Sequence, residues 1–234
     1  MNLKQVAFLF IGQTPRSDTM EEMRRYLPDL QIREYGALDG VSEAEITSEY
    51  APKSHQDLLI SKLQNGRSVQ ISEEMLGGRL QLKLEQAVAD GAQLCVLMCT
   101  GSFPGLQSQV PLLTMDEVFH RNVELPTDIK TIGLIVPMEE QQVQFAAQYA
   151  HFKKEVLTAA ASPYGLTETI IEEALKLKAR GAECICLDCM GYTDIQAQEV
   201  AVNTHLPVHT PRRETANQIL KIAVKKLDEK GVRY

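Results

Sequence analysis

The stretch GAQLCVLMCTG, residues 91–101, decides the fold because the chain repeats it as GAECICLDCMG at residues 181–191. The two stretches align without a gap at an offset of 90 residues, with Gly, Ala, Leu, Cys and Gly at matching places. Each follows an amphipathic helical pattern that ends in the glycine, and each leads into a loop. Repetition of a whole helix–strand–loop unit indicates an internal duplication, although two buried strands can also resemble each other by chance. Cys99 and Cys189 are therefore predicted to be equivalent residues that close two buried strands.

The opening segments of the two halves are also alike. KQVAFLFIG at residues 4–12 and KTIGLIVP at residues 130–137 each contain a continuous apolar run. Such runs are typical of parallel strands that are covered by helices on both faces. We predict an α/β fold with two pseudo-symmetric Rossmann-like subdomains, which consist of residues 1–127 plus 212–234 and of residues 128–211.

Strands and helices alternate along the rest of the chain. Hydrophobic patterns predict strands over residues 6–11, 31–37, 94–98, 110–113, 130–137, 156–160, 183–187 and 206–209. They predict helices over residues 18–27, 43–49, 72–91, 115–123, 140–153, 167–180, 194–202 and from 213 onward. Asn65–Gly66 lies between two alternating segments and favours a two-residue turn. Residues 57–72 are thus predicted to form an antiparallel hairpin that joins the main sheet.

Composition and charge restrict the partners of the chain. Of the 234 residues, 44% are hydrophobic and 24% are charged, as in an ordinary globular protein. The net charge of −7 argues against nucleic acid, because phosphate binding needs a basic face. The first apolar run is too short to span a membrane and lacks a signal-peptide cleavage site. We expect a cytoplasmic protein with free thiols and no membrane partner, and a homodimer is the default assembly.

The two matched cysteines suit proton transfer. Ligands of open parallel α/β sheets bind beyond the carboxyl ends of the strands, where Cys99 and Cys189 are expected. Two halves packed about a pseudo-two-fold axis would present both thiols to one cleft from opposite sides. One thiolate could then remove a proton from carbon while the facing thiol delivers one to the other face, without a cofactor. The alternative for each cysteine is a buried apolar residue.

Other loops carry weaker candidates for binding residues. Gln13, Thr14 and Arg16 follow the first strand, where Arg16 could bind a carboxylate and Thr14 could donate a hydrogen bond. An ordinary surface arginine in a turn is the alternative. Residues 137–140, PMEE, occupy the matching place in the second half, and their acids are expected to favour a helix N-terminus. Tyr164 could reach the cleft, although an ordinary loop tyrosine is the favoured interpretation.

No metal or cofactor is expected. Cys184, Cys186 and Cys189 have His205 and His209 nearby in the sequence, which invites a zinc interpretation. Alternation along a strand instead puts Cys184 and Cys186 on one buried face. The sequence contains neither GxGxxG nor GxxxxGK[ST], and it contains no serine nucleophile elbow.

Four segments in order resemble a known family over nearly the whole chain. They are GQTPR (12–16), EYAP (49–52), IVPMEE (135–140) and LDCMG (187–191). With the paired cysteines, they resemble the aspartate/glutamate/hydantoin racemase superfamily, and within it the AroM family. The resemblance implies a two-subdomain α/β fold with the active site between the halves. It also implies that Cys99 and Cys189 are the catalytic acid and base.

The resemblance also implies a binding site for substrate next to the cysteines. Residues after the first cysteine hold the substrate carboxylate in the racemases, which corresponds to Thr100, Gly101 and Ser102. The residues after the second cysteine, Met190, Gly191 and Tyr192, are included as binding residues. The implied partner is a small carboxylate-bearing molecule.

This sequence departs from the amino-acid racemases around both cysteines. Those enzymes usually have Cys-Asn-Thr and Gly-Cys-Thr, whereas this chain has Cys-Thr-Gly at residues 99–101 and Asp-Cys-Met-Gly at residues 188–191. Asp188 would raise the pKa of the Cys189 thiol unless it points away or is paired. We therefore expect a racemase-like or isomerase-like enzyme that moves a proton alpha to a carboxylate of another small acid. The alternatives are a cysteine-dependent decarboxylase or cis–trans isomerase of this fold, or a non-catalytic binding or regulatory protein.

Overall fold

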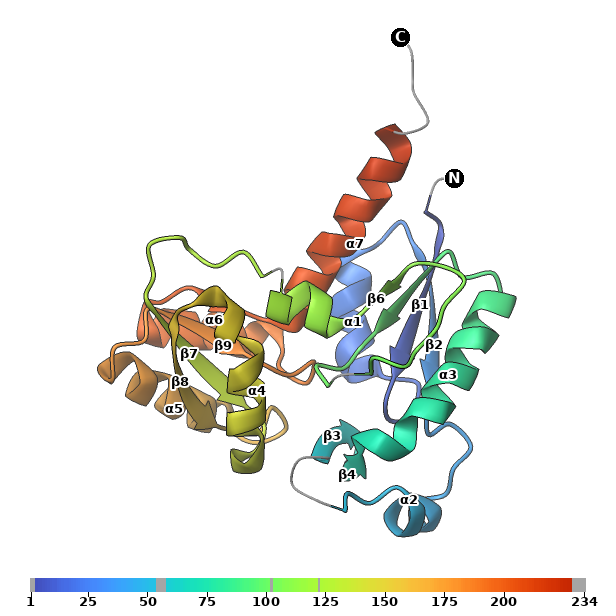
Figure 1. The fold of residues 1–234 in the computed structure, drawn as a ribbon, viewed down its shortest axis with the longest axis horizontal. Coiled ribbons are helices and arrows are strands. Elements are labelled where there is room, and N and C mark those ends of the chain that lie inside the picture. Colours follow the sequence, from blue (N-terminus) through green and yellow to red (C-terminus); the bar gives the residue numbers. More distant parts are fainter. Residues whose placement is uncertain (1–2, 54–57, 102, 122, 229–234) are drawn as a thin grey trace.

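Two parallel sheets, one from each half of the sequence, make up the fold (Figure 1). The computed structural model describes residues 3–53, 58–101, 103–121 and 123–228. The first sheet has the strand order β2-β1-β5-β6 and consists of β1 (Gln5–Phe10), β2 (Gln31–Gly36), β5 (Leu94–Leu97) and β6 (Leu112–Leu113). The second sheet has the order β8-β7-β9-β10 and consists of β7 (Thr131–Val136), β8 (Glu155–Ala160), β9 (Cys184–Leu187) and β10 (Val208–His209). Counted along the chain, the two halves thus share one strand order, and the predicted fold class is confirmed.

The backbone around the repeated stretches matches in detail. Gly91 and Gly181 precede β5 and β9 with φ angles of +93° and +106°, in the region that glycine adopts without strain. The residues two positions on, Gln93 and Glu183, each accept backbone N–H groups at the start of the first strand of their own half. These equivalent bonds set the same register between the first and third strands of each sheet.

Helices cover the sheets much as the sequence pattern predicts. The α-helices are α1 (Ser17–Tyr26), α2 (Glu43–Glu49), α3 (Glu73–Ala89), α4 (Gln142–Gln148), α5 (Thr167–Ala179), α6 (Asp194–Thr204) and α7 (Pro211–Asp228). The helix predicted over 140–153 is instead divided into η3 (Glu139–Gln141), α4 and η4 (Ala150–Phe152), because both ends tighten into 3-10 turns. The helix predicted over 115–123 is a π-helix, η2 (Asp116–Arg121). None of the helices in the described ranges is long and apolar enough to cross a membrane.

The predicted hairpin is present, but it does not join the main sheet. Strands β3 (Leu58–Lys62) and β4 (Ser68–Ser72) pair antiparallel as a separate two-stranded sheet, and residue 57 lies outside the described residues. The turn is also longer than two residues, since the N–H of Leu63 bonds the carbonyl of Arg67 at 2.9 Å. Leu59, Leu63 and Ile71 are buried in the core of the first half. Packing of these side chains, rather than edge pairing, therefore holds the hairpin in place.

Two helical segments, α7 and η2, contribute side chains to the cores of the two sheets. Ala216 and Ile219 of α7 are buried in one cluster with Phe8 and other residues of the first half, and α7 packs beside α1 (Figure 1). Phe119 of η2, which comes before the second half begins, is buried in the core beneath β7 and β9. The two halves are therefore packed into one body, with both crossing segments near the junction.

Candidate active site

Cys99 and Cys189 occupy equivalent positions with equivalent hydrogen bonds. Each lies two residues beyond the end of its strand, β5 for Cys99 and β9 for Cys189. Each sulfur accepts a hydrogen bond from the backbone N–H of the glycine two residues further on. The N–H···Sγ distances from Gly101 and Gly191 are both 3.3 Å. A backbone N–H group directed at the sulfur favours the thiolate, so the same interaction stabilises negative charge on both cysteines.

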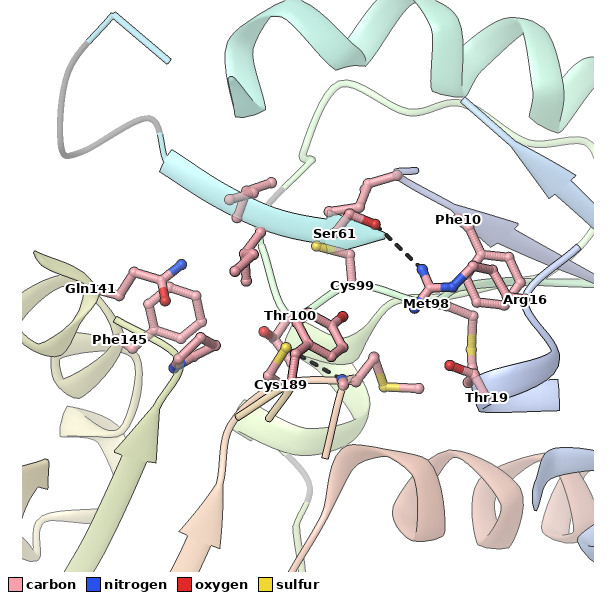
Figure 2. Close-up of a pocket in the computed structure, with 17 residues that line it drawn as sticks. Phe10, Arg16, Thr19, Ser61, Met98, Cys99, Thr100, Gln141, Phe145 and Cys189 are labelled. Atoms are coloured by element: carbon pink, nitrogen blue, oxygen red, sulfur yellow. Dashed lines mark hydrogen bonds between the residues drawn. The ribbon is translucent and has the colours of Figure 1, made fainter. Parts of the chain in front are cut away.

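Both cysteines line one cavity of about 30 Å³ (Figure 2). In Figure 2, Arg16 lies toward one end of the cavity and Gln141 toward the other, with Cys99 and Cys189 between them. The lining residues come from both halves and from the hairpin: Phe10, Ile11, Arg16, Thr19, Leu59, Ile60, Ser61, Met98, Cys99, Thr100, Pro137, Gln141, Phe145, Tyr164, Cys189, Met190 and Gly191.

Arg16 is a buried cation at the cavity. Its side chain is 7% exposed and makes two hydrogen bonds of 2.9 Å to the carboxylate of Asp18. Its guanidinium lies over the ring of Phe10, 5.3 Å from the centroid, and Nη1 donates to Ser61 at 3.3 Å. Burial opposes the charge of Arg16, but the bonds to Asp18 leave its pKa above the ordinary value. An oriented, desolvated arginine of this kind is suited to a carboxylate ligand.

Several residues predicted to bind substrate lie elsewhere. Gln13 bonds the backbone of Val41 and Gln64, and Thr14 bonds Asp39 through both its N–H and its hydroxyl, so both brace loops. Tyr192 is fully buried, and its hydroxyl donates to the carbonyl of Ala161. These three side chains do not line the cavity. Backbone groups bond Gln13 and Tyr192, and the carboxylate of Asp39 bonds Thr14.

The other predicted binding residues divide into three groups. Thr100, Met190 and Gly191 line the cavity together with Arg16. Gly101 does not line it, but its N–H bonds the sulfur of Cys99. Ser102 lies outside the described residues.

Several lining residues were not among those predicted to bind substrate. Ser61 comes from the hairpin, and Gln141 and Phe145 come from the segment after β7. Tyr164, for which the cleft was the less favoured of two interpretations, lines the cavity, and the Nζ of Lys62 lies 4.4 Å from its ring centroid. One signal in the sequence could have pointed to Gln141. It directly follows IVPMEE, which occupies the place in the second half that matches the loop of Arg16 in the first.

The two thiols have unequal electrostatic surroundings. Burial raises the pKa of Cys99 far above the ordinary 9.0, and negative charge at Glu73 adds to this effect. Burial also raises the pKa of Cys189, but only to about 11, because Arg212 and Arg16 partly offset it. Both thiols are therefore neutral near pH 7, and Cys189 is the more acidic of the two.

Asp188 points away from the cavity and is paired. Its carboxylate is fully buried and lies 3.0 and 3.1 Å from Nε2 of His120. The hydroxyl of Tyr149 donates to the same carboxylate at 3.1 Å. These partners compensate for burial of the charge. Asp188 still contributes to the raised pKa of Cys189, though less than burial does.

Arg212 joins the loop after Cys189 to the first half. Its side chain is 1% exposed and donates to the backbone carbonyls of Met190 and Gly191. It also forms an ion pair of 3.0 Å with Glu22 and a hydrogen bond of 3.3 Å with Thr19, both in α1. One buried arginine thereby fixes the position of the second cysteine loop against the helix that follows β1.

Metal ligands do not come together in the described part of the chain. No group of three or more His, Cys, Asp or Glu side chains there is arranged to hold a metal ion. Cys184 and Cys186 point into one core cluster, whereas Cys189 packs against another.

Solved structures with this fold belong to the aspartate/glutamate racemase superfamily. Unliganded arylmalonate decarboxylase has a TM-score of 0.63 at 14% identity, covering 94% of this chain and 93% of that one. Allantoin racemase from Klebsiella pneumoniae has a TM-score of 0.62 at 13% identity, covering 95% and 89%. The maleate isomerase Iso from Pseudomonas putida S16 has a TM-score of 0.62 at 11% identity, covering 94% and 92%. The chain thus has the fold of this superfamily.

Within that fold class the sequence itself identifies the family. The family model described as AroM protein matches residues 6–222. The chain belongs to the AroM family, as its four ordered segments predicted. Comparison with curated protein sequences gives no match.

Proposed function

We propose that this protein is a cofactor-independent enzyme that moves a proton at the carbon alpha to the carboxylate of a small acid. The observation that carries the proposal is the pair of thiols, each with a glycine N–H on its sulfur, that line one cavity together with a buried arginine. Arg16 would bind the carboxylate, with Ser61 beside it. The alpha carbon would then lie between Cys99 and Cys189.

The reaction divides into two proton transfers. The thiolate of one cysteine takes the proton from the alpha carbon, and the electron pair moves into the carboxylate, whose charge Arg16 stabilises. The facing thiol then gives its proton to the opposite face of the carbon. One cysteine ends protonated and the other ends as thiolate, so protons and charge balance and the configuration is inverted. Cys189 is the more favourable first base because its pKa is the lower of the two.

Exchange with solvent tests this proposal directly. The protein is incubated in deuterated water with separate enantiomers of 2-hydroxy, 2-amino, 2-ureido and 2-aryl acids, and the alpha proton is followed by NMR. We expect deuterium to enter at the alpha carbon of at least one acid, with the opposite enantiomer appearing. The absence of exchange with every acid would contradict the mechanism, as would exchange that persists after both cysteines are changed to alanine.

A decarboxylase is the second candidate that the comparison favours. Arylmalonate decarboxylase shares the fold, and loss of carbon dioxide from a malonate leaves the same carbanion alpha to a carboxylate. Because its pKa is raised, the Cys99 thiol keeps its proton at neutral pH and can supply it to that carbanion. Release of carbon dioxide from 2-substituted malonates, abolished by Cys99→Ala but not by Cys189→Ala, would favour this reaction over inversion. A binding protein would instead retain ligands unchanged in both assays.

A further inference from the structure

Gln141 presents a hydrogen-bond acceptor to the cavity. Its side chain is 2% exposed and lines the cavity next to Phe145. Nε2 donates to the backbone carbonyl of Leu58 at 3.1 Å, which fixes the amide orientation and leaves Oε1 as the free end. Oε1 is buried, and it has no hydrogen-bond partner among the residues that the structure describes. A buried acceptor in this condition favours a ligand that donates a hydrogen bond to it.

The position of Gln141 relative to Arg16 specifies what that ligand must carry. The two side chains approach the cavity from opposite ends, and the sulfur atoms of Cys99 and Cys189 lie between them (Figure 2). A carboxylate bound by Arg16 places the alpha carbon toward the thiols. A substituent on that carbon can then extend toward Gln141, whose Oε1 accepts hydrogen bonds and cannot donate them.

We propose that Gln141 is a specificity-determining residue that selects acids with a hydrogen-bond donor, a hydroxyl or an N–H group, on the alpha carbon. This inference rests on the proposed function, because it takes Arg16 as the carboxylate site. Phe145 and Leu59, which also line the cavity, are apolar and provide no substitute donor for Oε1. A methyl group in place of the donor would leave Oε1 buried and unpaired, and a site of this kind rejects such an analogue strongly.

Binding of matched acids tests the proposal without requiring turnover. Lactate is compared with 2-methylpropionate, and mandelate with 2-phenylpropionate, since each pair exchanges a hydroxyl for a methyl group of similar size. Isothermal titration calorimetry gives the dissociation constants. We expect the wild-type chain to bind each hydroxy acid at least about tenfold more tightly than its methyl partner.

Two variants separate the acceptor from the other contact of Gln141. Gln141→Met keeps the volume but removes both the acceptor and the bond to Leu58, so the preference for the hydroxy acid should fall to within about twofold. Loss of the Leu58 contact affects both acids of a pair alike and cancels in the ratio. Gln141→Glu keeps an acceptor oxygen and should retain the preference, although its charge weakens the binding of both acids.

Gln144→Met is the matched control. Gln144 lies in α4, its Oε1 is also buried without a partner among the described residues, and it does not line the cavity. This substitution should leave the preference unchanged. Equal wild-type binding of hydroxy and methyl acids would overturn the proposal, and so would a preference that survives Gln141→Met.

The outcomes also separate this inference from the proposed function. A chain that binds lactate or mandelate selectively but exchanges no alpha proton would support the role of Gln141 and contradict proton transfer. A chain that exchanges alpha protons without the preference would contradict only the role of Gln141. Failure to bind any of the four acids would overturn the proposed substrate class.

Discussion

The two strand ends of this protein share one backbone but differ in the side chains around it. Met98 precedes Cys99 and lines the cavity, whereas the equivalent Asp188 precedes Cys189 and bonds the buried His120 and Tyr149. The charge near Cys99 is the carboxylate of Glu73, whereas Cys189 interacts with two arginines, Arg16 and Arg212. The repeated backbone brings two thiols to one cavity, and the unequal neighbours give them different acidities. A duplicated fold can thereby provide a base and an acid from the same residue type.

The largest effect is expected from removing either thiol. Cys99→Ala and Cys189→Ala should each lower the rate of inversion by about 10²- to 10⁴-fold, the usual contribution of a general acid or base. Each variant should also lose exchange of the alpha proton preferentially from one enantiomer, and the two variants should affect opposite enantiomers. NMR in deuterated water, started from each pure enantiomer, measures both quantities.

Cys95→Ala is the control for that comparison. Cys95 is buried within β5 and does not line the cavity, so its removal should leave the rates nearly unchanged. Loss of exchange from the same enantiomer in both cavity variants would mean that the thiols do not act on opposite faces.

The next largest effect is expected from replacing Arg212, which fixes the loop after Cys189. Arg212→Met removes the ion pair with Glu22 and the bonds to the carbonyls of Met190 and Gly191. The free energy of unfolding should fall by about 3–5 kcal/mol, because a buried carboxylate loses its partner. Urea denaturation measures the change.

Arg213→Met provides the neighbouring comparison. Its side chain is 45% exposed, and its ion pair with Asp194 is at the surface, so its loss should cost less than about 1 kcal/mol. Equal losses in the two arginine variants would show that the loop after Cys189 does not depend on Arg212.

A smaller effect is expected from removing a hydrogen-bond partner of Asp188, the residue that corresponds to Met98 in the first half. Tyr149→Phe removes a hydrogen bond to a fully buried carboxylate and should cost about 1.5–3 kcal/mol of unfolding free energy. Tyr192→Phe removes a bond to a neutral carbonyl and should cost about 0.5–1.5 kcal/mol. Urea denaturation of both variants compares them, and a larger loss for Tyr192→Phe would contradict the assignment of charge to Asp188.

The sequence was sufficient for the fold class and for the structural equivalence of Cys99 and Cys189, because both follow from the repeated pattern of residues. The glycine, the apolar strand and the cysteine recur at one offset, and a strand end is a position that hydrophobic patterning locates well. Arg16 could also be proposed as a candidate from the sequence, since it lies in the loop after the first strand, where ligands of such sheets bind.

Other parts of the site could not be predicted, because they depend on contacts between distant segments. Ser61 reaches the cavity only because the hairpin packs on the core of the first half instead of joining the sheet. Gln141 faces the cavity because its amide bonds Leu58, which is 83 residues earlier in the chain. Gln13 and Thr14 have suitable chemistry, but neighbouring loops already satisfy them.

The smallest effect is expected from a change of pH, which tests the difference in pKa between Cys99 and Cys189. The pKa of Cys189 is raised in the folded chain from 9.0 to about 11, so its contribution to stability is complete below pH 9 and is lost as pH rises toward 11. At pH 10 the loss from Cys189 should be about 1 kcal/mol, because the unfolded chain releases a proton that the folded chain retains. Urea denaturation of the wild type and of Cys189→Ala between pH 8 and 10 isolates this contribution. Alkylation with iodoacetamide over the same range should modify Cys189 before Cys99, since burial raises the pKa of Cys99 further and the carboxylate of Glu73 adds to that effect. The reverse order would make Cys99 the first base and exchange the roles of the two halves.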